Sequence, residues 1–504
     1  MPRDAEHQNI MLVMGALMLV LLLAALDQTI VSTALPRIAS DLDALNELSW
    51  VVTAYLLTTA VTTPLYGKLS DLYGRKRMLS AAVIIFLIGS ALSGLSQGIV
   101  ELVIFRAVQG LGAGGLISLV FAAVGDVVAP RERGRYQGYF GAVFGLASVV
   151  GPLLGGVATD YFSWRWIFYI NLPIGILALV ALYLRLPEHQ YHRRHAIDYL
   201  GAALLSAAVV AVLLVAVWGG VTYPWGSPAI LLLALGGAAA AVAFVVTEAR
   251  ALEPILPLGL FKNRIFAVST ALSFVTGIAM FAALVYLPEY QQVVRGYSAT
   301  KSGLLMLPLI LGLVGASIGS GRIISKTGKY RWFPIIGTIL TGYGLWLLSH
   351  VGVATPQTTL SVWMFITGLG IGSFMQVLTL SVQNAVDPRD LGTATASVAF
   401  FRTIGSTLGT AGLGALLANR VQEYIAALLP GAAGQVNVSG GFSTIARLDP
   451  AVALRVTEAF AAAFRDLFLW TLPFALAAFV ISFFLKEMPL RERSEEYAAG
   501  QGFE

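Results

Sequence analysis

An acidic residue, Asp27, lies in the middle of a long apolar stretch that covers residues 11–35. A carboxylate inside lipid is costly unless it is paired, hydrated or protonated, and such residues usually mark an ion or proton path. An acid whose surroundings change can take up a proton on one side of a membrane and release it on the other. The sequence therefore predicts proton coupling through Asp27.

Arg106 is the only Lys or Arg that lies well inside one of the first six apolar stretches. An arginine in such a place is expected to pair with an acid on a neighbouring helix. The pair with Asp27 has two interpretations, a structural clamp between two helices or a part of the coupling machinery. We expect the second.

The segment GKLSDLYGRKRM, residues 67–78, closes a short turn between two apolar stretches. Gly67 and Gly74 permit a tight turn and a close approach of helices. Asp71 can lie against a helix N-terminus, and Arg75 can bind a carboxylate. We expect a breakable latch, whereas the alternative is a loop that only carries positive charge.

A further segment, GLASVVGPLLGG at residues 145–156, combines a proline with several glycines. Pro152 removes a backbone donor and bends the helix. The glycines Gly145, Gly151, Gly155 and Gly156 allow a neighbouring helix to pack backbone to backbone. Generic small-residue packing is the alternative, but the corresponding segment of the second half, GTAGLG at 409–414, lacks the proline.

Candidates for a substrate cavity are polar or aromatic side chains within apolar stretches. Aromatic and Met side chains suit an adaptable lipophilic pocket, although they suit a lipid-facing surface equally well. The candidates are Gln109, Phe274, Phe281, Tyr286, Met375, Gln376, Phe400, Phe401 and Arg402.

Missing residues exclude several kinds of chemistry. The chain has no cysteine, and none of its five histidines lies in a long apolar stretch, so we expect no disulfide and no metal site. It contains no GxxxxGK[ST] and no HExxH pattern, which argues against ATP-driven transport and against an enzyme. A net charge of +5 is too mild and scattered for nucleic-acid binding.

The elements that position these residues follow from composition. Of the 504 residues, 57% are hydrophobic and 12% are charged, which excludes a water-soluble protein and indicates a polytopic, all-α membrane protein. A spanning helix needs roughly 20 apolar residues. Fourteen such stretches are predicted, at 11–35, 47–67, 78–97, 99–125, 135–158, 164–185, 198–218, 227–248, 264–288, 301–322, 332–350, 357–382, 392–418 and 465–486.

The distribution of basic residues predicts the orientation. Most of the 32 Lys and Arg residues lie in loops on the same side as the termini, such as 74–77, 131–135 and 321–331. Positively charged loops stay in the cytoplasm, so both termini are expected there. The loop at 419–464 is then expected to be external.

Two matched segments reveal a weak internal repeat. TGLGIG at 367–372 matches QGLGAG at 109–114, and DPRDLG at 387–392 matches APRERG at 129–134, both at an offset of 258. Parallel six-helix repeats are typical of transporters with two rocking halves. We predict a first bundle at 1–190, an insert of two helices with linkers at 191–262, a second bundle at 263–488 and a cytoplasmic tail at 489–504.

These motifs resemble those of the major facilitator superfamily. The segment at 67–78 is similar to its loop signature, LVIFRAVQGLGA at 102–113 to its fourth-helix motif, and the segment at 145–156 to its antiporter motif. LDQTIVSTALP at 26–36 and WRWIFYINLPIG at 164–175 resemble motifs of its fourteen-spanner drug/proton antiporters. The resemblance also implies that Arg75 pairs with Asp126.

The resemblance implies a proton-coupled antiporter of the cell (inner) membrane. It would export lipophilic or cationic compounds by alternating access, use the proton gradient in place of a cofactor, and act as a monomer. Two alternatives remain open. One is a lipid or glycolipid exporter, and the other is a non-transporting membrane sensor or scaffold.

Overall fold

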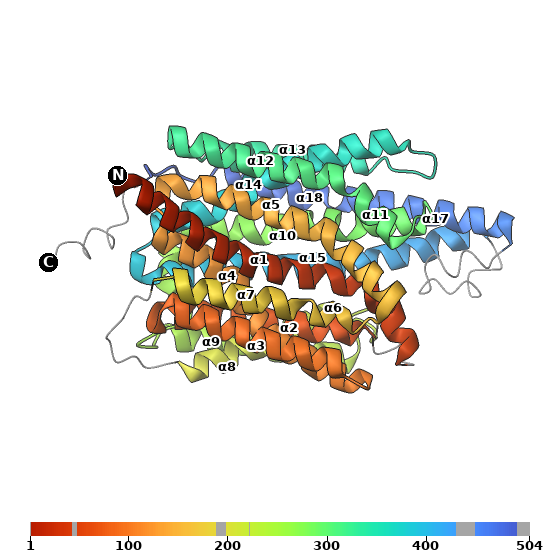
Figure 1. Cartoon of the computed structure of the whole chain (residues 1–504). Helices are drawn as coiled ribbons and strands as arrows, with labels where there is room; N and C mark the ends of the chain where they lie inside the picture. Colours follow the sequence, from red (N-terminus) through yellow and green to blue (C-terminus); the bar gives the residue numbers. More distant parts are fainter. Residues whose placement is uncertain (1, 43–47, 188–197, 221, 430–448, 491–504) are drawn as a thin grey trace.

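The computed structural model describes residues 2–42, 48–187, 198–220, 222–429 and 449–490. Long helices run side by side through almost the whole of this part, and no strand occurs within it (Figure 1). Eleven described segments are long and apolar enough to cross a membrane, and Trp332–Leu348 is a shorter apolar helix. The predicted all-α membrane class therefore agrees with the structure, while the number of fourteen spans stays a prediction.

The helices of the first half pack mainly against one another. They are α1 (Pro2–Asp41), α2 (Leu48–Tyr73), α3 (Arg75–Leu95), α4 (Ile99–Val127), α5 (Pro130–Val157), the π-helix η1 (Ala158–Phe162), α6 (Trp166–Tyr169) and α7 (Asn171–Arg185). Near-continuous apolar sequence leaves these helices hydrophobic all round, as expected for a lipid-embedded bundle.

The second half forms a similar group. Its helices are α10 (Arg264–Val293), α11 (Ala299–Leu305), α12 (Leu307–Thr327), α13 (Trp332–Leu348), α14 (Gln357–Ala385), the 3-10 helix η3 (Pro388–Asp390), α15 (Leu391–Leu428), α17 (Pro450–Trp470) and α18 (Leu472–Ser482).

The predicted insert forms a hairpin of α8 (Tyr199–Trp218) and α9 (Pro228–Glu248), followed by the 3-10 helix η2 (Leu258–Lys262). Helix α8 contacts α2 of the first half and α15 of the second half. Two contacts hold the insert in place, an edge-to-face pair of Trp50 and Trp218 with centroids 5.6 Å apart and an ion pair of Lys68 with Glu253 at 2.6 Å.

The two halves meet along two lines, where α5 packs on α12 and where α15 packs on α2 and α4. At Gly134 and Gly321 the backbones of α5 and α12 touch, and an added Cβ at Gly134 would lie 3.0 Å from the Gly321 carbonyl oxygen. Larger residues would separate the helices there.

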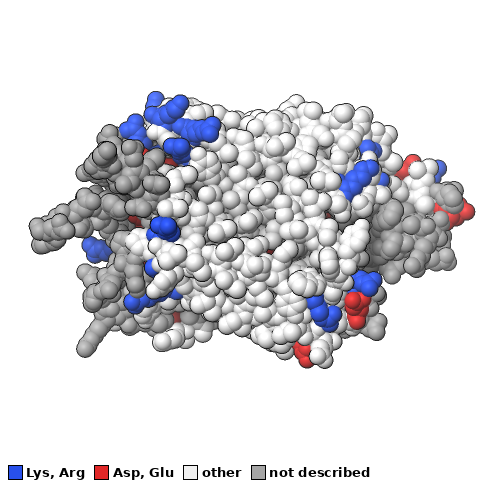
Figure 2. Space-filling model, viewed as in Figure 1, with Lys and Arg blue, Asp and Glu red and all other residues white. Residues whose placement is uncertain are grey.

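Charged side chains gather toward the two ends of the molecule and leave a broad, almost uncharged middle on the face seen in Figure 2. This distribution suits a belt of lipid around the bundle. We call the end that carries Arg75 and Gly392 the Arg75 end. The other is the opposite end.

The segment 419–464, expected to be a loop, is helical where the structure describes it. Helix α15 continues to Leu428 and α17 already begins at Pro450, while 430–448 lie outside the described residues. The reason is an apolar spacing of four, which the higher polarity of the segment concealed. It places Leu413, Leu417, Val421 and Ile425 in a buried cluster with α17.

The tail predicted at 489–504 lies outside the described residues apart from its first two positions. The same holds for 191–197 of the first linker.

Candidate functional site

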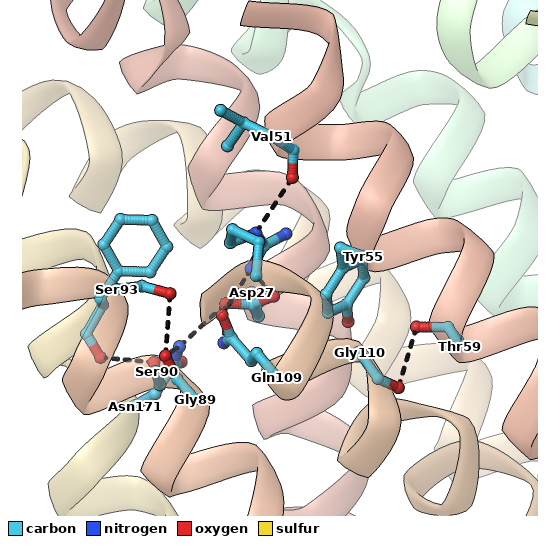
Figure 3. A network of polar contacts seen from close by, with 12 residues as sticks. Asp27, Val51, Tyr55, Thr59, Gly89, Ser90, Ser93, Gln109, Gly110 and Asn171 are labelled. Atoms are coloured by element: carbon cyan, nitrogen blue, oxygen red, sulfur yellow. Dashed lines mark hydrogen bonds and ion pairs between the residues drawn. The ribbon is translucent and has the colours of Figure 1, made fainter. Parts of the chain in front are cut away.

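Asp27 is completely buried and lies at the centre of a polar network in the first half (Figure 3). Arg106 Nη1 donates to Asp27 Oδ2 at 3.0 Å. Gln109 Nε2 and Asn171 Nδ2 donate to Asp27 Oδ1, at 2.8 and 2.9 Å. Helices α1, α4 and α7 thus converge on one carboxylate, whose charge three donors stabilise.

Arg106 has partners besides the acid. Its Nη1 also donates to Gln109 Oε1 at 2.7 Å, and its Nε donates to the Val51 carbonyl oxygen at 3.4 Å. The guanidinium carbon lies 4.1 Å from the centroid of the Tyr55 ring and 5.7 Å from that of Phe168. Such cation–π contacts stabilise a desolvated arginine, so Arg106 stays partly satisfied whether or not Asp27 is ionised.

Close packing of α3 and α4 positions this network. Gly89 of α3 lies against Gln109, where an added Cβ would come within 2.7 Å of the Gln109 Cβ. Asn171 is the first residue of α7, and its Nδ2 also donates to Ser90 Oγ at 3.0 Å. A larger residue at Gly89 would push α4, and Gln109 with it, away from α3.

A second network closes the Arg75 end. Arg75 pairs with Asp71 at 2.5 Å and with Asp126 at 2.7 Å, and it also donates to Ser70 Oγ. The three charged side chains come from α2, α3 and α4, which places the implied Arg75–Asp126 pair at the end of the bundle.

Asp71 also reaches across to the second half. It accepts hydrogen bonds from the Gly392 amide at 2.9 Å, the Thr393 amide at 2.7 Å and the Thr393 hydroxyl at 2.8 Å. These amides belong to the first turn of α15, where the helix dipole favours a negative charge. Asp71 therefore ties the first half to the second at this end.

Glycines make this junction close. An added Cβ at Gly67 would lie 3.0 Å from the Gly392 carbonyl oxygen, so only glycine allows α2 and α15 to approach this far. Gly74 has φ +91°, a left-handed conformation that lets a single residue separate the end of α2 from the start of α3.

The segment 145–156 lies on α5 between the two halves. Gly145 faces Ile310 and Val314 of α12, Pro152 lies against Gly303 of α11, and Gly151 packs against Thr29 of α1. Gly156 lies near Thr300, and Gly155 is buried. The segment thus packs against helices of both halves, in the part of α5 that lies toward the end opposite to Arg75.

The nine cavity candidates lie in several different packing environments. Gln109 belongs to the Asp27 network. Phe281 and Met375 pack with α12 and α14, and the Tyr286 hydroxyl donates to the Thr410 carbonyl oxygen. The candidates lie in different surroundings because they lie on different faces of their helices. A uniformly apolar sequence does not show which face of a helix turns to lipid.

Phe400 and Phe401 turn toward the insert. Phe400 is part of the cluster that α15 shares with α8 and α9, and the Phe401 ring lies 6.1 Å from that of Phe261. Of the remaining candidates, Phe274 borders Gly405 through its backbone, and Gln376 and Arg402 have no hydrogen-bond partner within the described part of the chain.

Sequence reasoning missed Asn171 and Tyr55. Asn171 lies in the WRWIFYINLPIG segment and is a polar residue at the start of an apolar helix, which is the one signal that marks it. Tyr55 carries no signal, since aromatic residues are common throughout α2.

Two packed helix groups, the first with a buried acid–arginine pair and both joined at one end by an ionic contact, are the architecture expected of a membrane transporter built from two halves. Residues 17–410 match the family model of the Major Facilitator Superfamily. The chain therefore belongs to the Major Facilitator Superfamily and is a multi-pass membrane transporter.

Named relatives agree with this assignment. An uncharacterized MFS-type transporter of Mycobacterium tuberculosis, MT1926, is 41% identical over 98% of this chain and 72% of its own length. Multidrug resistance protein 3 of Bacillus subtilis is 36% identical over 95% of this chain and 96% of its own, and the multidrug transporter protein MdtP of the same organism is 38% identical over 83% and 77%.

Among solved structures, the proton:xylose symporter XylE matches with a TM-score of 0.64 over 96% of this chain and 98% of its own. The sequence identity of 14% makes this a similarity of fold alone.

Proposed function

We propose that this transporter exports lipophilic, often cationic compounds from the cytoplasm or inner leaflet in exchange for protons. The observation that carries the proposal is the complete burial of Asp27 among Arg106, Gln109 and Asn171. The multidrug names of the Bacillus relatives support the substrate class.

Protonation of Asp27 would remove a buried negative charge and weaken its three hydrogen bonds. Arg106 would then keep Gln109 Oε1, the Val51 carbonyl and the Tyr55 ring as partners. A network that satisfies the arginine in both charge states suits a proton carrier, since neither state leaves an isolated buried charge.

The Asp71 junction would be the gate at the cytoplasmic end. Opening there requires Asp71 to release two backbone amides and one hydroxyl of α15. Because Asp71 keeps Arg75 as a partner, the carboxylate is not left unpaired when the halves part. Alternating access would come from rocking of the halves along α5–α12 and α2–α15.

The proton gradient is sufficient for this task. One proton that crosses 100 mV supplies about 2.3 kcal/mol. That energy supports roughly a 50-fold concentration ratio of an uncharged compound exchanged for one proton. One-for-one exchange of a monovalent cation moves no net charge and is driven by the pH difference alone. No resident cofactor is required.

The fourteen-spanner drug/proton antiporters are the subgroup that we propose, in the cell (inner) membrane with both termini cytoplasmic and with a monomer as the working unit. The basic loops near Arg75 and Arg131 support this orientation under the positive-inside rule.

The test is dye export from proteoliposomes after a pH jump, with Asp27→Asn compared with wild type. We expect D27N to lose uphill export completely while it inserts normally, because an amide cannot carry the proton. Asp387→Asn, which removes an exposed loop carboxylate, is the matched control and should export as wild type does. Undiminished uphill export by D27N would overturn the coupling role of Asp27.

The same preparation separates the alternatives. A transporter that moves a phospholipid or glycolipid but no dye would be a lipid exporter. A protein that releases no proton when dye is added would fit a sensor or scaffold.

A further inference from the structure

Arg402 is a charged residue in the first third of α15 that has no partner among the residues that the structure describes. Its guanidinium makes no hydrogen bond, ion pair or ring contact with any residue in the described ranges. The side chain is nevertheless partly exposed, whereas Arg106 of the first half is almost completely buried and fully engaged. An arginine inside a membrane protein requires a negative or hydrogen-bond-accepting partner.

The direction of Arg402 follows from the other residues of α15. Phe401 faces the insert through Phe261, on the outer side of the helix. Thr395 faces inward, where its hydroxyl accepts from Gln383 Nε2 of α14 at 3.3 Å. Arg402 follows Thr395 by seven residues, or about two helical turns, so both lie on the same face. Arg402 therefore points to the inner side.

The contacts of Gln383 show that the inner side of α15 faces the first half. Gln383 Nε2 also donates to the Phe121 carbonyl oxygen of α4 at 2.8 Å, so the Thr395–Gln383 contact is part of the closed junction between the halves. Along this face Thr395 and Ala399 are buried, and exposure begins at Arg402. Arg402 thus lies about 10 Å beyond the closed junction, on the face of α15 that the junction turns toward the first half.

A second unpaired donor lies at the same height. Gln376 precedes Gln383 by seven residues on α14, which runs antiparallel to α15, so it also lies about two turns beyond the junction and on the same helix face. Gln376 is 4% exposed, and its Nε2 has no hydrogen-bond partner in the described part of the chain. Both α14 and α15 therefore carry, about two turns from the junction, a donor without an acceptor among the described residues.

The acids of the described membrane core cannot serve Arg402. Asp27 is occupied by three donors. Glu289 lies on α10, twelve residues beyond Gly277, the residue that packs on the Arg402 backbone, and this is a distance of about 18 Å along the helix. The described residues therefore supply no acceptor for Arg402, which leaves the guanidinium available to a bound molecule.

We propose that Arg402, with Gln376, binds an anionic group of the transported compound, so that zwitterionic or anionic amphiphiles bind better than their neutralised counterparts. The inference rests on the proposed export function and specifies its substrate class. A carboxylate, sulfonate or phosphate matches the two parallel N–H groups of a guanidinium. The Gln376 amide would be a further hydrogen-bond donor to the same anionic group. The apolar remainder of the compound would lie among Phe281, Met375 and Phe274.

The test uses a rhodamine dye that carries a free carboxylate and the ethyl ester of the same dye. Binding of each to purified full-length protein in detergent is measured by fluorescence polarisation. We expect wild type to bind the acid about tenfold more tightly than the ester, as one charge-assisted hydrogen-bonded contact supplies. Arg402→Gln should remove that preference, and Arg402→Lys should keep part of it.

The matched control is Arg389→Gln, which removes an exposed arginine near the start of α15 and should keep the wild-type preference. Absence of a preference in wild type would overturn the proposal without any variant. Equal losses for acid and ester in R402Q, or an unchanged ratio, would also overturn it. Export of both dyes by wild type with no acid preference would leave drug export standing while this inference fails.

The anionic group has two sources, a soluble compound or a lipid headgroup. Displacement of the acid dye by short-chain phosphatidylglycerol, with phosphatidylcholine as the comparison, identifies the headgroup. Displacement by neither lipid identifies the soluble compound.

Discussion

The two halves of this transporter differ in whether the charged side chains near the membrane core have partners. In the first half each described charge near the membrane core has a partner, as in Asp27 with Arg106 and Asp71 with Arg75. In the second half Arg402 and Glu289 have no hydrogen-bond or ion-pair partner among the described residues. Under the proposed mechanism, the paired charges of the first half would serve coupling and gating, and the unpaired ones of the second half would be left to meet a substrate.

The two equivalent junctions between the halves differ in the same way. A third pairing of the repeat sets GKLSDLYGRKR at 67–77 beside GRIISKTGKYR at 321–331, so that Ser325 corresponds to Asp71. Asp71 binds the first turn of α15, whereas Ser325 lies near Gly134 at the start of α5. The Ser325 hydroxyl has no partner, and Arg131 donates to the Ser325 carbonyl oxygen at 3.3 Å. One junction is ionic and the other is held mainly by backbone packing, so we expect loss of the ionic contacts to weaken the closed state more.

The strongest way to sharpen this comparison is to unpair a charge in the first half. Arg106→Gln leaves Asp27 buried without a countercharge, and removal of one member of a buried pair typically costs about 3–5 kcal/mol. We expect a large drop in thermal stability, measured by fluorescence-detected size-exclusion chromatography after heating. The double variant D27N/R106Q should recover most of it.

Arg402→Gln is the matched change in the second half. Since Arg402 has no described partner to lose, it should be at least as stable as wild type. A loss in R402Q equal to that in R106Q would contradict the contrast between the halves.

A smaller effect, on how often the Arg75 end opens, is expected when the Asp71–α15 junction is given the residue of the Ser325–α5 junction. Asp71→Ser gives the first junction the residue of the second and removes the charge-assisted bonds to α15, each worth about 1.5–3 kcal/mol. The Arg75 end should open more often. Because the chain has no cysteine, Ala396→Cys provides a unique probe behind Gly67, and its labelling by a maleimide should accelerate about tenfold.

The reciprocal variant, Ser325→Asp, places a carboxylate at the first turn of α5. Labelling of Ser317→Cys, which lies behind Gly141, should slow a few-fold through the helix dipole. If D71S left labelling unchanged, the ionic junction would not be the barrier.

The smallest expected effect concerns Asp390 beside the ionic junction. Burial raises the pKa of the Asp390 carboxyl, and the charge of Asp71 raises it further. A carboxyl whose pKa rises on folding favours the folded state only when protonated, so its ionised form is unfavourable near neutral pH. Asp390→Asn should raise Tm by at most about 2 °C at pH 7.

That gain should disappear as the pH falls through the raised pKa of Asp390, because wild type then carries the proton. Glu132→Gln, at the equivalent position of the first repeat, changes an exposed residue and should leave Tm unaltered. A wild type more stable than D390N at pH 7 would show that Asp390 is a favourable charge.

Much of the charged framework is readable from sequence because charges in apolar stretches are rare. Asp27 and Arg106 stand out individually, and a pair is the simplest way to satisfy both. The spacing of Asp71 and Arg75 likewise indicates a helix terminus and a carboxylate as partners, although it does not say that the terminus belongs to α15.

Features that depend on helix faces are not readable in this way. Asn171 joins Asp27 only because α7 begins beside α1, and Phe401 leaves the interior only because the insert covers that side of α15. Uniformly apolar helices carry no amphipathic signal that distinguishes lipid, insert and interior. For the same reason the isolation of Arg402 requires the arrangement of α14 and α15 to be known.

The position of α8 has a mechanical consequence. Since α8 touches α2 and α15, it acts as a brace across a joint, and any rotation of the halves must shear at least one of these surfaces. The Trp50–Trp218 contact at the end of α8 and the Lys68–Glu253 pair, in the segment that follows α9, would resist that shear. Substitutions along α8 are therefore expected to change how fast the transporter turns over rather than which molecules it carries.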